Sequence, residues 1–234
     1  MSKLKRPVSP KFWPIERKTK KYVVKPKPGP HSLEKSIPLG IIVRDVLHYA
    51  ETMKEAKEVL IQGNLKVDGI IRKEHNFPAG LMDVLTLGDD NYRILAGKRG
   101  LYLKKISGNE AKVKLLRIRN KKTVKKGKIQ LNFHDGSNKI VEANDKLAKS
   151  GTGDTLIINI EKKSVEKIIK YDQGNLGMIV EGKNVGVVGK IRKIIITKSP
   201  KPNMVTLEGK EKIAVPRDFV FVIGEDKPVI DVEG

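Results

Sequence analysis

The chain has 234 residues, with 48 Lys and Arg against 27 Asp and Glu, a formal net charge of +21 and a pI near 9.9. So large an excess of positive charge opposes compaction and predicts a polyanionic partner, above all nucleic acid. The absence of cysteine excludes disulfides and thiolate metal sites, and without an apolar run of membrane length or a signal sequence we expect a soluble, cytoplasmic protein.

Residues 1–36 are expected to form an extended basic arm. Ten basic residues by position 28 stand against a single acidic residue, Glu16, and frequent prolines leave no helix or strand period, so we expect the arm to order on a polyanion. Phe12, Trp13 and Tyr22 suit either base stacking or, more often, anchoring of an arm to protein surface. The side chains expected to meet nucleic acid here are Lys3, Lys5, Arg6, Lys11, Trp13, Arg17, Lys18, Lys20 and Lys21.

The sequence pattern of residues 37–90 predicts a compact α+β module. IIVRDVLHYA and TMKEAKEVLIQG carry apolar residues at helical spacing, and Thr52 with Glu55 forms a capping box at the start of the second helix. In LKVDGIIR, Asp68 and Gly69 mark a tight β-hairpin, which gives Gly69 a structural role. Basic side chains on the helix and hairpin either share one binding face or form an ordinary solvated side. The candidates are Arg44, Lys54, Lys57, Lys66 and Arg72.

Residues 91–172 contain regularly spaced short strands with turn signals, which indicate an antiparallel β-domain. Between positions 104 and 128, eleven basic residues stand against Glu110 alone. The candidates for anion contact are Lys121, Lys122, Lys125 and Lys126.

Residues 173–234 predict five short strands, a number that suits a small SH3-like barrel. The stretch EGKNVGVVGKIRKI at 181–194 invites comparison with a P-loop, but Asn184 stands where a P-loop needs glycine and Ile191 where it needs Ser or Thr. Gly186 and Gly189 are therefore expected to serve the strand backbone.

No catalytic constellation stands out. The four histidines are too dispersed for metal-ligand spacing, and no paired carboxylates, activated nucleophile or glycine-rich cofactor motif is evident. We therefore expect no enzymatic activity, cofactor, metal or small-molecule substrate.

Four strings, in this order and spacing, resemble the small-subunit ribosomal protein S4e family of archaea and eukaryotes. They are PKFWPIERKTKKYVVKPKPGPHSLEKSIPLG, VDGIIRKEHNFPAGLMDV, SGTGDTLIINI and NVGVVGKI. PGPH and FPAGLMDV have no generic structural reason to occur together, which makes the resemblance specific. The chain stops soon after the predicted barrel, whereas eukaryotic members are expected to continue, so we expect an archaeal source.

The resemblance implies a protein that binds small-subunit ribosomal RNA beside neighbouring ribosomal proteins. It implies four parts: a basic arm (1–36), an S4-like RNA-binding domain with the alpha-L motif (37–90), a family-specific β-domain (91–172) and a KOW barrel (173–234). In the alpha-L motif it points to Lys54, Lys57, Gly63, Lys66 and Arg72. Thr52-Met53 stands where that motif often has Ser-Arg, so threonine keeps the capping role while methionine replaces the arginine. In the KOW element, whose glycine corresponds to Gly189, it points to Lys190, Arg192 and Lys193 as contacts with RNA or with a neighbouring protein.

Two other functions stay open on the sequence alone. Alpha-L modules also accompany RNA-modifying enzymes such as pseudouridine synthases, which would need an active-site aspartate in a recognisable setting. A KOW element also occurs in transcription elongation factors, but that alternative leaves the arm and the alpha-L module unexplained.

Overall fold

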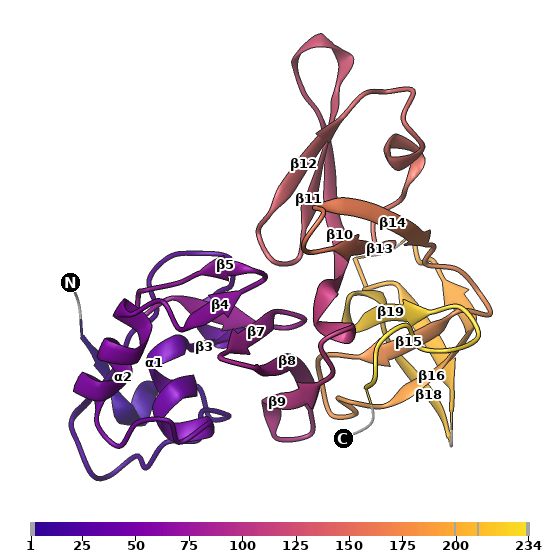
Figure 1. Cartoon of the computed structure of the whole chain (residues 1–234). Coiled ribbons are helices and arrows are strands. Elements are labelled where there is room, and N and C mark those ends of the chain that lie inside the picture. Colours follow the sequence, from indigo (N-terminus) through magenta and orange to yellow (C-terminus); the bar gives the residue numbers. More distant parts are fainter. Residues whose placement is uncertain (1–2, 199, 210, 233–234) are drawn as a thin grey trace. The chain divides into compact units, whose positions relative to one another are not determined.

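The fold is described by a computed structural model that covers residues 3–198, 200–209 and 211–232 (Figure 1). The outermost residues of the predicted arm and barrel, and positions 199 and 210, therefore lie outside the described residues. Nearly all regular structure is antiparallel sheet with few helices, as the sequence predicts.

The chain divides into two compact units. The first comprises Met1–Leu95 and Arg99–Lys114, and the second comprises Ala96–Lys98 and Leu115–Gly234. Each unit has its own core, as expected for a long chain with few aromatic residues.

Nine strands precede the long strand β10. They are β1 (Leu4–Lys5), β2 (Tyr22–Val23), β3 (Ser36–Pro38), β4 (Leu65–Val67), β5 (Ile70–Ile71), β6 (Pro78–Gly80), β7 (Val84–Leu87), β8 (Asp90–Gly97) and β9 (Gly100–Ile106). They form the two-stranded sheets β1-β2 and β3-β6 and the five-stranded sheet β5-β4-β7-β8-β9. The predicted boundary at residue 90 falls inside this last sheet, because the sheet includes β7 before that residue and β8 and β9 after it. The first unit therefore reaches Lys114.

Helices are short. The predicted helix at IIVRDVLHYA is only α1 (Leu39–Ile41) followed by a π-helical turn, η3 (Ile42–Val46), because His48 adopts a left-handed φ of 55°. The second helix, α2 (Met53–Ile61), begins with the predicted capping box of Thr52 and Glu55. Turns of 3₁₀ helix are η1 (Arg6–Val8), η2 (Leu33–Lys35), η4 (Glu110–Lys112), η5 (Lys125–Gly127), η6 (Lys146–Lys149) and η7 (Arg217–Phe219).

The later strands form two five-stranded sheets. Their members are β10 (Val113–Thr123), β11 (Ile129–Phe133), β12 (Asn138–Val141), β13 (Thr155–Asn159), β14 (Ser164–Ile169), β15 (Leu176–Ile179), β16 (Val188–Ile195), β17 (Met204–Glu208), β18 (Lys212–Pro216) and β19 (Val220–Gly224). The orders are β12-β11-β10-β13-β14 and β18-β17-β16-β15-β19, so the five strands predicted after residue 172 are confirmed.

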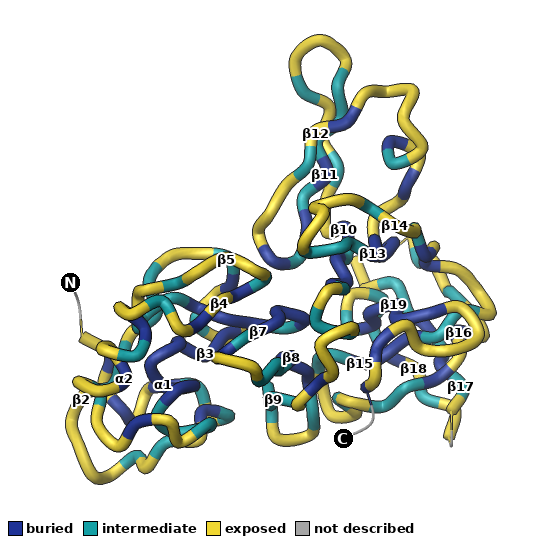
Figure 2. Tube along the Cα trace, viewed as in Figure 1, coloured by how far each residue is buried: buried dark blue, intermediate teal, exposed yellow. Residues whose placement is uncertain are grey.

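Buried residues lie along the strands of all three five-stranded sheets (Figure 2). In the first unit, Leu60, Leu65 and Leu85 have no exposed surface. This core also takes in Leu4 and Trp13 from the N-terminal segment.

Candidate nucleic-acid interface

The N-terminal segment is anchored to the first unit. Trp13 is only 3% exposed, and its indole N–H donates a hydrogen bond of 2.8 Å to the carbonyl of Ser36. The burial of Trp13 therefore favours the anchoring alternative for this aromatic residue over contact with RNA. Because the indole is enclosed by the core, no base can stack on it.

Two arginines of the same segment hold its own backbone. The Arg6 guanidinium donates to the carbonyls of Tyr22 and Glu16 and to the Thr19 hydroxyl, and Arg6 is 7% exposed. Arg17 donates to several backbone carbonyls, among them that of Pro10 at 2.7 Å. Arg6 is thus a buried cation that holds the backbone of its own segment, and Arg17 organises the segment's loop.

The other basic residues predicted on the arm are exposed. They are Lys3, Lys5, Lys11, Lys18, Lys20 and Lys21. Tyr22 is 41% exposed, and the Nζ atoms of Lys3 and Lys21 lie 5.2 and 5.4 Å from its ring centroid. The segment therefore buries its tryptophan but presents a tyrosine among lysines.

The helix α2 and the β4–β5 hairpin carry exposed cations. Lys54 and Lys57 lie on α2 and Lys66 on β4, and all three are exposed. The Arg72 guanidinium lies 4.5 Å from the Phe77 ring centroid. Arg44 is half-buried and pairs with its neighbour Asp45 at 2.9 Å, so its charge is already partly compensated.

The glycines of this module have clear backbone roles. Gly63 follows α2 with a φ of +82°, the left-handed conformation that ends many helices. Gly69, with a φ of +75°, completes the β4–β5 turn after Asp68, which also has a positive φ. The left-handed backbone at Gly69 accounts for a glycine at this position of the turn.

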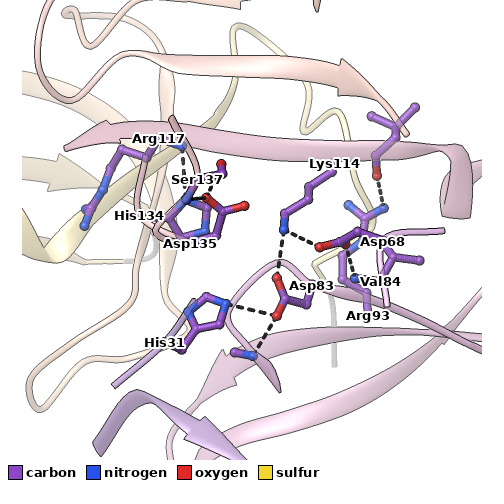
Figure 3. Close-up of polar contacts among 12 residues, drawn as sticks. His31, Asp68, Asp83, Val84, Arg93, Lys114, Arg117, His134, Asp135 and Ser137 are labelled. Carbon is purple, nitrogen blue, oxygen red and sulfur yellow. Dashed lines mark hydrogen bonds and ion pairs between the residues drawn. The ribbon is translucent and has the colours of Figure 1, made fainter. Parts of the chain in front are cut away.

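A buried polar cluster that the sequence analysis missed lies in the first unit (Figure 3). The Lys114 Nζ is 2.8 Å from one carboxylate oxygen of Asp83 and 2.6 Å from Asp68, and the other Asp83 oxygen is 2.9 Å from His31 Nε2. Asp83 also accepts a hydrogen bond from the backbone N–H of Gly80. The cluster therefore joins the end of the N-terminal segment, two sheet loops and the start of β10.

The surroundings shift the pKa values of the two carboxyl groups of this cluster in opposite directions. Burial opposes ionisation of Asp83, but Lys114 and His31 outweigh it and lower the pKa of Asp83 well below its ordinary value. Burial and the nearby Asp83 raise the pKa of Asp68 to about 6, despite its contact with Lys114. The groups are satisfied by one another, which indicates a structural cluster.

The cluster explains why two of the diagnostic strings occur together. His31 ends PGPH, while Gly80 and Asp83 belong to FPAGLMDV. Besides the contact between His31 and Asp83, a Cβ atom on Gly80 would overlap the His31 imidazole ring. The signal was thus present in the strings, but no spacing rule links residues so far apart in the sequence.

The β10–β11 hairpin of the second unit has a cationic tip. Lys122, Lys125 and Lys126 are exposed there. Lys121 differs, since its Nζ donates to the carbonyls of Ala148 and Ser150. Lys121 therefore holds the η6 segment by hydrogen bonds, and the exposed charges of the tip are those of Lys122, Lys125 and Lys126.

In the C-terminal sheet, Gly189 is buried where β16 passes close to β17. A Cβ atom on Gly189 would lie 2.8 Å from the Glu208 carbonyl oxygen, so a close approach of the two backbones accounts for the glycine. Gly186 has a φ of +87° and serves the turn before β16. No phosphate-binding loop is needed to explain either glycine.

The cations beside Gly189 are partly paired. Lys190 contacts Asp226 at 3.0 Å, and Arg192 forms an ion pair with Glu208. Lys193 is exposed. An incoming RNA phosphate would therefore exchange with acidic partners at Lys190 and Arg192.

Within the described residues, no three His, Cys, Asp or Glu side chains gather as a metal site would require. None of the helices in the described ranges has the length and apolar character of a membrane span. Small β-rich units with many exposed lysines define a class of protein that is suited to polyanions.

Comparison with known proteins is consistent with this class. The family model described as Ribosomal family S4e matches residues 88–165, and the RS4NT domain matches residues 2–34. The small ribosomal subunit protein eS4 of Archaeoglobus fulgidus is 43% identical over 234 residues, which is 97% of each chain. Its counterpart from Methanosphaera stadtmanae is 43% identical over 99% of this chain and 95% of its own.

A solved structure is also similar. The crystal structure of the 30S ribosomal protein S4e from Thermoplasma acidophilum aligns with a TM-score of 0.71 and 33% identity over 82% of this chain and 96% of that chain. The chain belongs to the ribosomal protein S4e family. The resemblance inferred from the four sequence strings is thereby confirmed.

Proposed function

We propose that this chain is a structural component of the small ribosomal subunit in the cytoplasm, where it binds ribosomal RNA and supports subunit assembly and translation. The observation that carries the proposal is the 43% identity, over 97% of both chains, to a curated small ribosomal subunit protein. The net charge of +21 supplies the physical means, because neutralised phosphates release counterions and favour binding. This role requires no enzymatic turnover.

The proposal assigns a part to each region. The segment 1–36 is an anchored basic arm, the region from residue 37 is an alpha-L module, the sheet containing β10 to β14 is the family-specific domain, and residues 173–234 are a KOW barrel. Support for the alpha-L assignment comes from α2 being followed directly by the β4–β5 hairpin with exposed cations on both. Support for the barrel comes from five consecutive antiparallel strands with a close approach at Gly189.

The proposed RNA contacts are the predicted cations that remain exposed, together with the backbone at Gly63 and the half-buried Arg72. The exposed cations are Lys3, Lys5, Lys11, Lys18, Lys20, Lys21, Lys54, Lys57, Lys66, Lys122, Lys125, Lys126 and Lys193. Arg44, Lys190 and Arg192 join them by exchanging a carboxylate for a phosphate. Neighbouring ribosomal proteins complete the proposed environment.

A salt wash of small subunits that contain the tagged chain tests the proposal. A structural component stays on the subunit in moderate salt, whereas an RNA-modifying enzyme or a transcription elongation factor leaves it. With purified small-subunit RNA, neutralising roughly eight phosphates gives a slope of log affinity against log salt of about −6 to −7. Loss of the chain in the wash, or a flat salt response, would contradict the proposal.

A further inference from the structure

One face of the strands β10, β11 and β12 carries amide side chains in register. Asn120 of β10 lies opposite Asn132 of β11, which in turn lies opposite Asn138 of β12. Two residues away on each strand, a second row consists of Lys122, Gln130 and Ile140. Because side chains two residues apart on a strand share a face, both rows lie on the same side of the sheet. These six residues are called the amide face below.

The amide face points away from the core of the second unit. Leu131 and Val141, which alternate with its residues along β11 and β12, belong to the hydrophobic core instead. Gln130 and Asn132 on the middle strand are half-buried, and the four residues on the two flanking strands are exposed. Ile140 is 56% exposed although its side chain is large and apolar. Another molecule can therefore reach this face across three strands.

The row of three asparagines is unusual, because asparagine is depleted in strands, where its side chain competes for backbone hydrogen bonds. The Asn120 Oδ1 accepts the N–H of Lys121 at 2.7 Å, beside an irregularity in the pairing of β10 with β11. The Gln130 Nε2 donates to the Asn132 Oδ1 at 2.7 Å. Neither bond uses the NH2 group of Asn120 or Asn132, or the carbonyl oxygen of Gln130. The face therefore keeps hydrogen-bond donors and an acceptor for a ligand.

The charges at the amide face favour an anionic ligand. Lys122 is the single cation among its six residues, and none of the six is acidic. Next to the face, Lys128 and Glu142 form an ion pair of 2.9 Å, so these two charges compensate each other. Lys125 and Lys126 are exposed at the tip of the β10–β11 hairpin. Face and tip together suit a ligand that presents hydrogen-bonding groups beside a row of phosphates.

The minor groove of an RNA duplex has this arrangement. It is wide and shallow, and it displays base edges and 2′-hydroxyls, which both donate and accept hydrogen bonds, between two phosphate backbones. Three strands spaced about 4.8 Å apart give a row of side chains roughly 10 Å across, which is wider than the ~6 Å minor groove of B-form DNA. Unpaired RNA is held largely by stacking of bases on aromatic rings, and the amide face contains none.

We propose that the amide face binds the minor groove of an RNA duplex, with Asn120, Asn132 and Asn138 hydrogen-bonded to 2′-hydroxyls and base edges. Lys125 and Lys126 meet the phosphates that border the groove. This site deepens the proposed ribosomal role and rests on it, because it names the form of RNA that one sheet of the protein holds. The amides distinguish RNA from DNA through the 2′-hydroxyl, while the lysines supply binding that is independent of sequence.

Binding of the full-length chain to a short RNA duplex and to the DNA duplex of the same sequence, measured by fluorescence anisotropy, tests the site. The face variant is Asn132→Ala/Asn138→Ala. Its control, Asn144→Ala/Asn184→Ala, removes two amides from exposed loops of the same unit. A second pair, Asn138→Asp and Asn184→Asp, adds one negative charge without changing the size of the side chain. Thermal unfolding by circular dichroism verifies the fold of each variant.

The face variant should lose roughly tenfold in affinity for the RNA duplex, as expected for two hydrogen bonds of ordinary strength. Its affinity for the DNA duplex should change no more than that of the control, so the preference for RNA falls by the same factor. The slope of log affinity against log salt should stay unchanged, because amides neutralise no phosphate.

The tip variant Lys125→Ala/Lys126→Ala should show the reverse behaviour. It should reduce the steepness of the salt slope by up to about 2, roughly 0.9 for each lost phosphate contact, and leave the preference for RNA over DNA intact. Misfolding does not produce this pair of opposite results. Asn138→Asp should weaken binding to the RNA duplex more than Asn184→Asp does, because it places a carboxylate against the groove. Since Asn138 is exposed, this comparison decides the matter even if the face double variant unfolds.

Equal behaviour of the face and control variants towards the RNA duplex would overturn the inference, and this is also the result expected if the face binds a protein instead. An equal loss for the RNA and DNA duplexes, or a loss as large for single-stranded RNA, would overturn it too. Binding to whole small-subunit RNA, measured in parallel, separates the two proposals. If the wild type binds the whole RNA while the face variants match their controls, the amide face is refuted and the ribosomal role stands. If the wild type fails to bind the whole RNA, the ribosomal proposal itself fails.

Discussion

The Nζ of Lys114 lies 2.8 Å from a carboxylate oxygen of Asp83, and the two side chains are only 6% and 2% exposed. A charge buried this deeply is costly unless it is paired and hydrogen-bonded. Here Asp68 and His31 complete the pairing, so the contact fixes β10 against the loop before β7. Removing one member of the cluster leaves the remaining buried charges without their ion-pair partner.

The first prediction concerns Lys114→Met, which keeps the length and much of the apolar stem of the side chain but removes its charge. Asp83 and Asp68 would then face each other without the shared ammonium group. Breaking a buried pair in this way should lower the free energy of unfolding by about 3–5 kcal/mol. Urea denaturation followed by Trp13 fluorescence measures this, because the single tryptophan is buried in the same unit.

Lys122→Ala provides the control for this prediction. Lys122 lies on the same strand, β10, but is exposed, so its loss should change the free energy of unfolding by less than about 0.5 kcal/mol. Similar effects of the two substitutions would show that the buried ion pairs do not stabilise the first unit.

The second prediction concerns pH. Because burial and Asp83 raise the pKa of Asp68 to about 6, from an ordinary value of 3.8, the folded protein holds this proton more tightly than the unfolded chain does. Folding is therefore favoured as the pH falls from 6 towards 4, and this contribution is lost as the pH rises through 6. Asp68→Asn should remove it.

The urea midpoint of the Trp13 transition, measured across this pH window, checks the sign. Asp83 contributes in the opposite direction. Because its pKa is lowered in the folded protein, it stabilises the fold at pH values above its ordinary pKa, and this contribution is lost as the pH falls further. The informative quantity is thus the difference between the wild type and Asp68→Asn. A difference that does not vary with pH, or that grows in favour of the wild type as the pH rises, would contradict the assignment.

Local features of this fold were predictable from local sequence. The capping box at Thr52 and the turn at Asp68-Gly69 involve residues within a few positions of one another, so their physical cause is contained in a short window. The five C-terminal strands also announce themselves locally, through short apolar runs separated by turn residues, whereas the contact that requires glycine at position 189 is made with Glu208 on the neighbouring strand β17.

Residues whose partners are distant in sequence escaped prediction. Basic composition predicts exposure for Arg6, but its partners are backbone atoms brought near by the fold of the arm. His31 meets Asp83 only because β3 pairs with β6 and brings the two strings together. Likewise, no signal near residue 90 shows that the sheet continues, since strand order is a property of the whole unit.

The third prediction follows from the anchored arm. Trp13→Ala removes a large side chain from the first core, and we expect a loss of about 3–5 kcal/mol in the free energy of unfolding. Trp13→Phe should cost less, because it keeps most of the apolar contact and loses the hydrogen bond to Ser36. Circular dichroism during urea denaturation measures both, with Tyr22→Ala as an exposed aromatic control. An unchanged transition for Trp13→Ala would mean that the arm adds nothing to the core.

The fourth prediction concerns Gly189→Val in the C-terminal sheet. The new Cβ would lie 2.8 Å from the oxygen and 2.9 Å from the carbon of the Glu208 carbonyl, and these are backbone atoms of the paired strand β17. Since backbone atoms cannot move aside as a flexible side chain does, the pairing of the two strands must loosen, and we expect the free energy of unfolding to fall by about 1–3 kcal/mol.

Lys190→Ala, next in the chain, should lower the free energy of unfolding by at most about 1 kcal/mol, because it removes only an exposed ion pair with Asp226. Thermal unfolding by circular dichroism should separate the two variants, while the Trp13 transition of the first unit stays unchanged in both. If Gly189→Val melted like the wild type, the close approach of β16 and β17 would not be what requires glycine at this position.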